Sequence, residues 1–380
     1  MKVLVTGAKG FIGKNLVAEL NNIRDGKSKK FDFLLPLTIY ECDADTTSEN
    51  FEQYCANCDF VFHLAGINRP IEPKEFMDGN LGFTVKLLKT LDNYDNHAGV
   101  LMSSSIQAEL DNEYGKSKKA AEEYLLQWSE KRGTCACIYR LPNVFGKWCK
   151  PNYNSVVATF CSNIANGLPV TVTDLEKEII FVYIDDVINS FIDSLRESES
   201  DIKYRSVQIQ YKIKLGYLAE ILKSFADERS KAICPYLPEN SFEKKLYATF
   251  LSYLPEDSFS YELQSHIDKR GSFTEFLKTP CYGQVSINIS KPHIVKGNHW
   301  HHTKNEKFLV VAGKGVIRFR KVGDSKIIQY FVSSDKLEVV DIPVGYIHNI
   351  ENLGDSDMVT IMWASECFDP ENPDTYYLEV

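Results

Sequence analysis

Val3-Leu-Val-Thr-Gly7-Ala-Lys-Gly10-Phe-Ile-Gly13-Lys-Asn-Leu-Val-Ala-Glu-Leu20 is the stretch that decides the fold of the first two thirds of the chain. A short apolar run enters a glycine loop, and a helical pattern follows it. Glycines here allow a tight turn, close approach to a pyrophosphate and close packing of helix on strand, while the helix N-terminus offers free N–H groups. The spacing is weak evidence alone, but a strand before it and a helix after it predict a dinucleotide site that uses Gly7, Gly10 and Gly13.

Residues 1–200 continue this alternation of apolar runs and amphipathic stretches, which predicts an α/β Rossmann-type, doubly wound parallel sheet. The second strand, Thr38–Asp43, follows a lysine-rich insert, Asn21–Lys30. A carboxylate on Asp43 would accept hydrogen bonds from a ribose diol and repel a 2′-phosphate, which favours NADH. The lysines of the insert favour NADPH if they fold over the ribose, so the sequence leaves both cofactors open.

The reactive residues of this region are expected at the start of a helix. Val100–Ser105 predicts a strand, and Tyr114 and Lys118 lie four apart on one face of the next helix. An ammonium beside a phenol lowers the pKa of the phenol, which can then give a proton to a carbonyl oxygen as hydride arrives. The alternative is a surface helix that happens to hold both residues. His63 reads as a core histidine rather than a catalytic one, and Asn80 as either a helix cap or an active-site brace.

The character of the chain changes in its last third. Residues 198–257 are polar, irregular and helical in pattern, with a helix at Leu215–Ala226. Short alternating strands separated by Gly and Pro turns follow, which predict an all-β domain of the jelly-roll type. Their expected positions are Gln284–Ser290, Lys307–Ala312, Gly315–Arg320 and Lys336–Val340. We therefore expect a reductase-like domain at residues 1–250 and a β domain at residues 251–380.

A group of histidines in the β domain has the pattern of a metal site. His299 and His301 are two apart, so in a strand both project from one face. Glu306 follows in the same hairpin, and His348 comes from a later strand. Three imidazoles and a carboxylate suit one divalent metal such as zinc, iron, manganese or nickel. We expect zinc.

Composition excludes several classes of protein. The net charge of −9 and pI near 5.5 argue against nucleic acid or an anionic membrane as partner. The sequence has no run of apolar residues long enough for a membrane span and no room for a signal peptide before the glycine loop. Ten cysteines scattered over the chain fit a reducing cytoplasm, and Cys55 and Cys58 are expected to be ordinary thiols.

The motifs of the first region resemble those of the extended short-chain dehydrogenase/reductases, which act on nucleotide sugars. The matching segments are Gly7–Gly13, His63–Gly66, Ser103–Ser105, Tyr114-x-x-x-Lys118, and Arg140-Leu-Pro-Asn143-Val-Phe-Gly146. The resemblance implies that Ser105 (or Ser104), Tyr114 and Lys118 are catalytic. It also implies that the sugar nucleotide is bound by the segment with Arg140 and Asn143 and by Phe181–Val187. Only eight residues separate Ser105 from Tyr114, so the substrate loop is shorter than is usual in the family.

The histidine region resembles both cupin motifs, although His293 and Leu337 stand where the upstream glycines are usual. A second resemblance overlaps the first. Asp268-Lys-Arg270-Gly271-Ser-Phe273-Thr-Glu275 and Lys296-Gly-Asn-His299 resemble segments of the cupin-fold nucleotide-sugar 3,5-epimerases, in which a histidine at the position of His299 is the general base. A metal-bound imidazole cannot also abstract a proton. We favour the metal, since four ligands match together, and the base is then expected among Glu275, His302 and Tyr346.

The two halves together resemble bifunctional enzymes of capsular polysaccharide synthesis. That resemblance implies C3 epimerisation of a UDP-2-acetamido-2,6-dideoxy-4-hexulose in the β domain, followed by C4 reduction with NADPH, or NADH, to a UDP-N-acetyl-6-deoxy-L-talosamine-type product. Epimerisation must come first, because a hydrogen is acidic beside a ketone and not beside an alcohol. A homodimer or higher homo-oligomer is expected. Two alternatives remain: a reductase whose cupin is a metal-stabilised dimerisation or binding module, and a dinucleotide sensor, which would not need Tyr114 and Lys118.

Overall fold

The computed structural model describes residues 1–70, 72–196, 202–371 and 373–380. The chain forms two compact units, the first of residues 1–222 with 245–254 and the second of residues 223–244 with 255–380. The domain boundary expected between residues 250 and 251 stays a prediction. Among the described residues, no helix is both long and apolar enough to cross a membrane.

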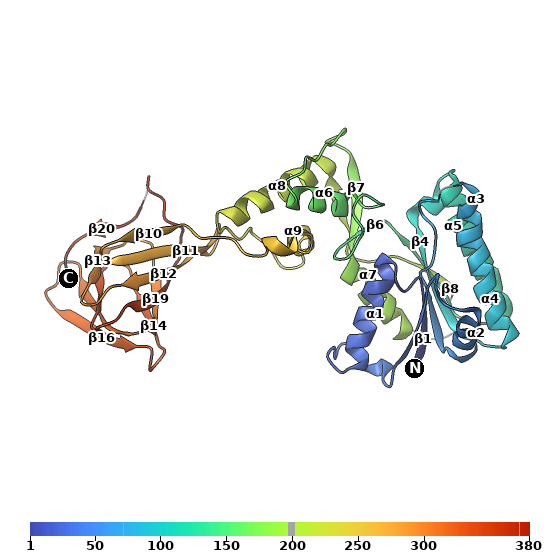
Figure 1. Ribbon diagram of the computed structural model, residues 1–380, viewed down its shortest axis with the longest axis horizontal. Helices are drawn as coiled ribbons and strands as arrows, with labels where there is room; N and C mark the ends of the chain where they lie inside the picture. Colours follow the sequence, from blue (N-terminus) through green and yellow to red (C-terminus); the bar gives the residue numbers. More distant parts are fainter. Residues whose placement is uncertain (71, 197–201, 372) are drawn as a thin grey trace. The chain divides into compact units, whose positions relative to one another are not determined.

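The first unit is built on a six-stranded sheet in which every neighbouring pair of strands is parallel. Its strands, in spatial order, are β2 (Thr38–Cys42), β1 (Lys2–Thr6), β3 (Phe60–His63), β4 (Gly99–Ser105), β5 (Ala136–Leu141) and β8 (Ile202–Arg205). Helices cover both faces of this sheet (Figure 1). On one face lie α1 (Phe11–Arg24) and α7 (Ile184–Asp193), and on the other α2 (Ser48–Asn57), α4 (Phe83–Asn93) and α5 (Glu113–Arg132). The predicted doubly wound parallel sheet is confirmed.

Helix α5 carries the expected reactive pair and has clear ends. The Asn112 side chain accepts a hydrogen bond from the backbone N–H of Gly115 at 2.8 Å, which satisfies a donor that the helix leaves free. Gly133 ends the helix at φ 64°, a left-handed conformation that favours glycine. The helix predicted to carry Tyr114 and Lys118 is thus present.

The rest of the first unit differs in one respect from the sequence prediction. A small sheet, β6-β7-β9, joins residues far apart in the chain, and further helices precede and follow it. The remaining elements of this unit are β6 (Asn143–Phe145), β7 (Glu178–Tyr183), β9 (Tyr211–Lys214), α3 (Lys74–Phe76), a π-helix η2 (Met77–Gly82) and α6 (Val156–Ala165), with short 3₁₀ turns at η1 (Asp32–Leu34), η3 (Ile106–Glu109) and η4 (Ser194–Arg196). Two helices, α8 (Leu215–Ser230) and α9 (Phe242–Leu251), have residues in both units, and the 3₁₀ turn η5 (Glu256–Ser258) belongs to the second unit. The helical reading of residues 198–257 was wrong at β8 and β9, because both strands form by pairing with distant partners, β5 and β7. Residues 197–201 lie outside the described part.

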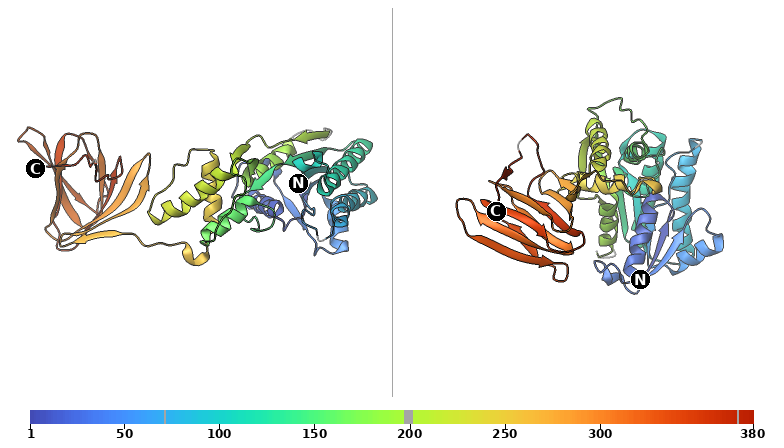
Figure 2. Two further views of the ribbon diagram at one scale, coloured as in Figure 1. Left: turned by 90° about the horizontal axis from the view of Figure 1, so that it is seen from above. Right: turned by 60° about the vertical axis from the view of Figure 1, so that its left-hand side comes forward.

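The second unit contains two antiparallel sheets that face each other (Figure 2). One has the order β10 (Ser265–Asp268), β11 (Gly271–Thr279), β12 (Gly283–Ser290), β19 (Met358–Ala364), β14 (Glu306–Ala312) and β17 (Val339–Ile342). The other has the order β16 (Ile327–Ser333), β15 (Lys314–Lys321), β18 (Tyr346–Asn352), β13 (Val295–Trp300) and β20 (Tyr376–Tyr377). A core that includes Phe308, Ile317 and Met358 lies between them. The predicted all-β region is confirmed, although the strand expected from Lys336 begins at Val339, since Lys336 still belongs to a turn that bridges back to Ser333.

Candidate functional site

The glycine loop joins β1 to α1 as the sequence predicts. Gly7 has φ +69°, and a Cβ on Gly13 would lie 2.1 Å from the Gly7 carbonyl oxygen, so helix and loop touch here without a side chain between them. Gly10 precedes the first turn of α1, where no side-chain atom covers the free N–H groups. The loop and the open helix N-terminus fit a pyrophosphate.

The structure brings Ser105, Tyr114 and Lys118 together at the carboxyl end of β4. A hydrogen bond joins the Tyr114 phenol to the Ser105 hydroxyl. Burial raises the pKa of Tyr114, and the Ser105 hydrogen bond opposes that rise. The Lys118 ammonium lies 3.4 Å from the Ser103 carbonyl oxygen and 6.0 Å from the centre of the Tyr114 ring. The expectation that Lys118 lowers the pKa of the phenol was wrong for this structure, because burial is the larger effect on Tyr114.

Burial also acts on the lysine itself. Lys118 is 8% exposed, and desolvation lowers the pKa of its ammonium to about 8, while Glu122 opposes that change. Such a lysine loses its proton far more readily than an ordinary one. The pair therefore places a neutral phenol beside an ammonium that can titrate near neutral pH, a suitable arrangement for passing a proton.

Asn80 braces the active site, one of the two roles that the sequence left open, the other being a helix cap. Its side chain is buried, its Oδ1 accepts the Ile67 N–H at 2.9 Å, and its Nδ2 donates to the Ser117 hydroxyl at 2.9 Å. A Cβ on Gly66 would lie 2.8 Å from Asn80 Oδ1 and 2.9 Å from Lys118 Nζ. Gly66 is thus the residue that gives both side chains room.

His63 is a core histidine, as expected. Its two ring nitrogens hydrogen-bond the hydroxyls of Thr6 at 2.8 Å and Thr84 at 2.9 Å, and burial lowers the pKa of its imidazole to about 3. Cys55 and Cys58 are buried free thiols, and burial raises the pKa of both. These three residues support the sheet and its helices.

The residues expected to bind substrate lie in different surroundings. Arg140 contacts Glu122 in a two-pronged ion pair at 2.6 Å and Glu109 at 2.7 Å, and its guanidinium stacks on Tyr204. This guanidinium already pairs with two protein carboxylates, and its assignment to the substrate stays a prediction. Asn143 is exposed on β6, and its amide donates to the Ile180 carbonyl at 3.3 Å, which leaves its oxygen available.

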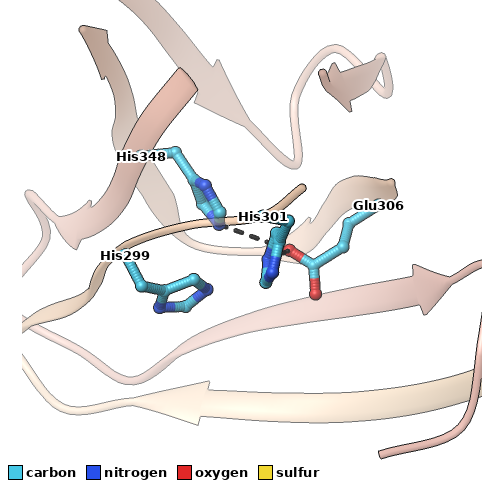
Figure 3. Close-up of side chains that lie close together, drawn as sticks. All are labelled: His299, His301, Glu306 and His348. Atoms are coloured by element: carbon cyan, nitrogen blue, oxygen red, sulfur yellow. Dashed lines mark ion pairs between the residues drawn. The ribbon is translucent and has the colours of Figure 1, made fainter. Parts of the chain in front are cut away.

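The four expected metal ligands converge in the second unit (Figure 3). His299 belongs to β13, His301 follows that strand, Glu306 opens β14, and His348 lies in β18 opposite His299. One ligand atom from each residue lies within 4.8 Å of the others. The Glu306 carboxylate is 3.5 Å from His301 Nε2 and 3.3 Å from His348 Nε2.

Unpaired atoms in this cluster indicate what it holds. Oε2 of Glu306 and the Nε2 atoms of His301 and His348 are buried and hydrogen-bond to none of the described residues. Burial would raise the pKa of Glu306, but the two imidazoles hold it well below its usual range. Burial lowers the pKa of His299 to about 4, with a further contribution from His348. A neutral imidazole and a charged carboxylate are the forms that bind metal, so the residues fit a divalent cation.

A cavity of about 880 Å³ adjoins this cluster within the second unit. All four of these residues line it, and so does Glu275. His302 is absent from its lining: its ring packs against Trp300 and Tyr376, because it points to the opposite side from His301. His302 therefore lies outside this cavity, and the choice of base among the three candidates stays a prediction. The lining also includes the polar residues His266, Asp268, Arg270 and Lys296.

Comparison with known proteins identifies relatives of both units. Residues 3–209 match the model of the NAD dependent epimerase/dehydratase family, and residues 266–376 match that of the polysaccharide biosynthesis C-terminal domain. The chain is 43% identical over all of its length, and 99% of the relative's, to the UDP-2-acetamido-2,6-beta-L-arabino-hexul-4-ose reductase of Pseudomonas aeruginosa.

Solved structures agree with these matches. The capsular polysaccharide assembling protein CapF from Staphylococcus aureus is 51% identical, with a TM-score of 0.90 and full coverage of both chains. The UDP-glucose 4-epimerase of Thermus thermophilus, solved with NAD, is 20% identical and has a TM-score of 0.53 over 67% of this chain and 99% of its own. This last likeness shows the fold of the first unit alone.

Proposed function

The chain belongs to the NAD dependent epimerase/dehydratase family and is CapF-like over its full length, and from this we propose a bifunctional enzyme of nucleotide-sugar metabolism. Its second unit would epimerise C3 of a UDP-2-acetamido-2,6-dideoxy-4-hexulose. Its first unit would then reduce the C4 ketone, giving a UDP-N-acetyl-6-deoxy-L-talosamine-type precursor of capsule or O-antigen. The name of the Pseudomonas relative supports the keto-sugar substrate.

The reductase role is carried by Tyr114. In this proposal the reduced nicotinamide supplies hydride to C4, and the phenol of Tyr114 gives its proton to the carbonyl oxygen. The Ser105 hydroxyl, which already hydrogen-bonds that phenol, holds the same oxygen. Lys118 stands behind Tyr114 and replaces the proton. Because burial keeps the phenol protonated until an oxygen with developing charge arrives, the proton moves only when hydride does.

The epimerase role belongs to the 880 Å³ cavity. Removal of the C3 proton of a 4-keto sugar needs a base that is free of the metal. Of the three candidates from the sequence, Glu275 lines the cavity, whereas His302 and Tyr346 do not. We assign the base to Glu275 and the metal ligands to His299, His301, Glu306 and His348. The cation, which we expect to be zinc, would hold β13, β14 and β18 in register around the cavity.

The observation that carries the proposal is that each unit holds a reactive cluster of its own. Tyr114→Phe should therefore abolish oxidation of the reduced cofactor while solvent deuterium still enters C3 of the UDP-4-keto-6-deoxy sugar in D₂O. Glu275→Gln should do the reverse: deuterium entry falls, and a substrate already inverted at C3 is still reduced. An NMR time course with and without cofactor measures both reactions.

Two outcomes of this experiment would contradict the proposal. Loss of both reactions in either variant would show that the clusters do not act separately. Reduction of the 4-keto sugar by the wild-type enzyme with no deuterium at C3 would show that the cupin unit is a metal-stabilised dimerisation or binding module. Lys116→Met is a matched control for Tyr114→Phe, because Lys116 lies on the exposed side of the same helix.

A further inference from the structure

A second cavity, of about 220 Å³, lies in the first unit beside the glycine loop. Ala8 and Lys9 of the loop line one side, and residues from the end of β2 to the first turns of α2 line the other. In sheets of this topology, the end of the second strand is the place where the adenosine ribose meets the protein. The cavity therefore lies where the protein contacts the 2′ position of the adenosine ribose.

Three carboxylates surround this cavity: Glu41, Asp43 and Asp45. Asp43 is fixed by two backbone donors, since its carboxylate accepts the N–H of Lys9 at 2.7 Å and that of Ala44 at 2.8 Å. Each of its oxygens keeps a lone pair for a further donor such as a ribose hydroxyl. Glu41 is exposed at the same rim.

Among the described residues that line the cavity, Lys9 is the one basic side chain. Its ammonium forms an ion pair with Asp45, and this pair raises the pKa of Lys9 and lowers the pKa of Asp45. The charge of Lys9 is thus cancelled by its neighbour. Asp43 and Glu41 leave the rim with an excess of negative charge.

The lysine-rich insert does not compensate for this charge. Lys27 pairs with Asp25 at 3.2 Å, and Lys30 lies over the Phe31 ring and lines a different cavity. Residues 21–30 are all described, and none of them lines the cavity beside the glycine loop. The alternative in which the insert folds over the ribose is therefore not realised.

We infer that this enzyme selects NADH over NADPH, with Asp43 as the acceptor for the ribose diol and Glu41 and Asp45 as residues that exclude a 2′-phosphate. The inference rests on the proposed reductase function. A 2′-phosphate brings close to two negative charges and needs a basic partner, whereas a diol brings donors that match carboxylates. The order of cofactors expected from the family resemblance, NADPH before NADH, is reversed here by the residues at the end of β2.

Direct titration tests the inference without turnover. Dissociation constants for NADH and NADPH are measured from nucleotide fluorescence with the full chain. Wild type should bind NADH about tenfold or more tightly than NADPH, since like charges a few ångströms apart repel strongly at a protein surface. Raising the salt concentration should narrow this ratio, because ions screen the repulsion.

Single substitutions show which carboxylates cause the preference for NADH. Asp45→Asn should release Lys9 and lower the ratio of the NADPH dissociation constant to the NADH dissociation constant several-fold. Glu41→Gln should also tighten NADPH. Glu49→Gln removes the same charge from the exposed side of α2, outside the cavity lining, and should leave the ratio as it is.

The results separate this inference from the proposed function. Binding of NADPH as tight as that of NADH in wild type overturns the inference and leaves the reductase intact. An unchanged ratio in Asp45→Asn and Glu41→Gln also overturns it. Failure of both dinucleotides to bind at millimolar concentration overturns the reductase function itself.

Discussion

The main-chain carbonyl of Asp374 lies 2.5 Å from Nδ1 of His301, a proposed metal ligand 73 residues earlier in the chain. An N–H on Nδ1 donates to this carbonyl, which leaves Nε2 as the lone-pair nitrogen that faces Glu306. The Asp374 carboxylate also accepts the backbone N–H groups of His302, Thr303 and Lys304 at 2.9–3.0 Å. One residue near the C-terminus therefore fixes both the ring of a ligand and the loop that carries it.

Asp374→Ala should weaken metal binding by about tenfold, the lower end of the usual range for residues that orient ligating histidines, because the main-chain carbonyl that faces His301 Nδ1 remains. The loop loses its three backbone contacts, so it holds His301 less firmly toward Glu306. Competition with a chromogenic chelator measures the affinity. Asp335→Ala, an exposed change in the same unit, is the control. Equal affinities in the two variants would show that the C-terminal segment does not position the ligand.

Removal of the metal should destabilise the second unit. The buried nitrogens and carboxylate oxygen of the cluster are left without partners when no cation is bound. At zinc concentrations about 100-fold above Kd, the free energy of unfolding should rise by about 2.7 kcal/mol over the apo protein. Thermal unfolding against zinc concentration measures this, and Glu306→Gln should flatten the response. An unfolding temperature that changes with neither zinc nor chelator would contradict the assignment of these residues to a metal site.

Gly66→Ala should lower the rate of ketone reduction at least tenfold. The new Cβ would lie within 3 Å of both Asn80 Oδ1 and Lys118 Nζ and would displace these side chains. Deuterium entry at C3 should be unaffected. Gly82→Ala serves as control, since its Cβ would meet only the Met77 carbonyl oxygen, at 3.8 Å. Equal reduction rates in the two variants would mean that the position of Lys118 is not critical.

Arg140→Met should lower the free energy of unfolding by about 3–5 kcal/mol, the cost of leaving a buried carboxylate without its partner. The Glu122 side chain is fully buried and also accepts the hydroxyls of Ser104 and Tyr204, so it stays in place when Arg140 is removed. The double variant Arg140→Met with Glu122→Gln should regain part of the loss. Urea unfolding measures this change. Full stability of Arg140→Met together with a raised KM for the sugar nucleotide would instead support a role of Arg140 in binding the substrate.

Features that depend on spacing within one element could be predicted from the sequence. The glycine loop, the Tyr114–Lys118 pair and the metal ligands of one hairpin follow from the periods of helix and strand. The same period of two places His302 on the opposite side from His301, so the position of His302 outside the cavity could also have been predicted.

Features that depend on distant partners could not be predicted. Asp374 reaches the metal site through a C-terminal segment, and nothing near His301 in the sequence points to it. Arg140 looked free for an anion because Glu122 and Glu109 come from other elements. Strands β8 and β9 have mixed, polar sequences and form by pairing with strands that precede them by tens of residues.

Burial of Lys118 should make the stability of the first unit depend on pH in an unusual direction. Its pKa is about 8 in the folded chain against 10.5 when unfolded, so between these values the unfolded chain binds more protons and stability rises with pH. Below pH 8 the buried charge costs roughly 3.5 kcal/mol, because the folded and unfolded chains hold this proton with different affinities. Lys118→Met should therefore exceed wild type in unfolding free energy at pH 7, by a margin that shrinks toward pH 10. Lys119→Met, exposed on the same helix, should show no such trend in urea unfolding. A margin that is equal at both pH values would mean that the folded pKa of Lys118 is not lowered.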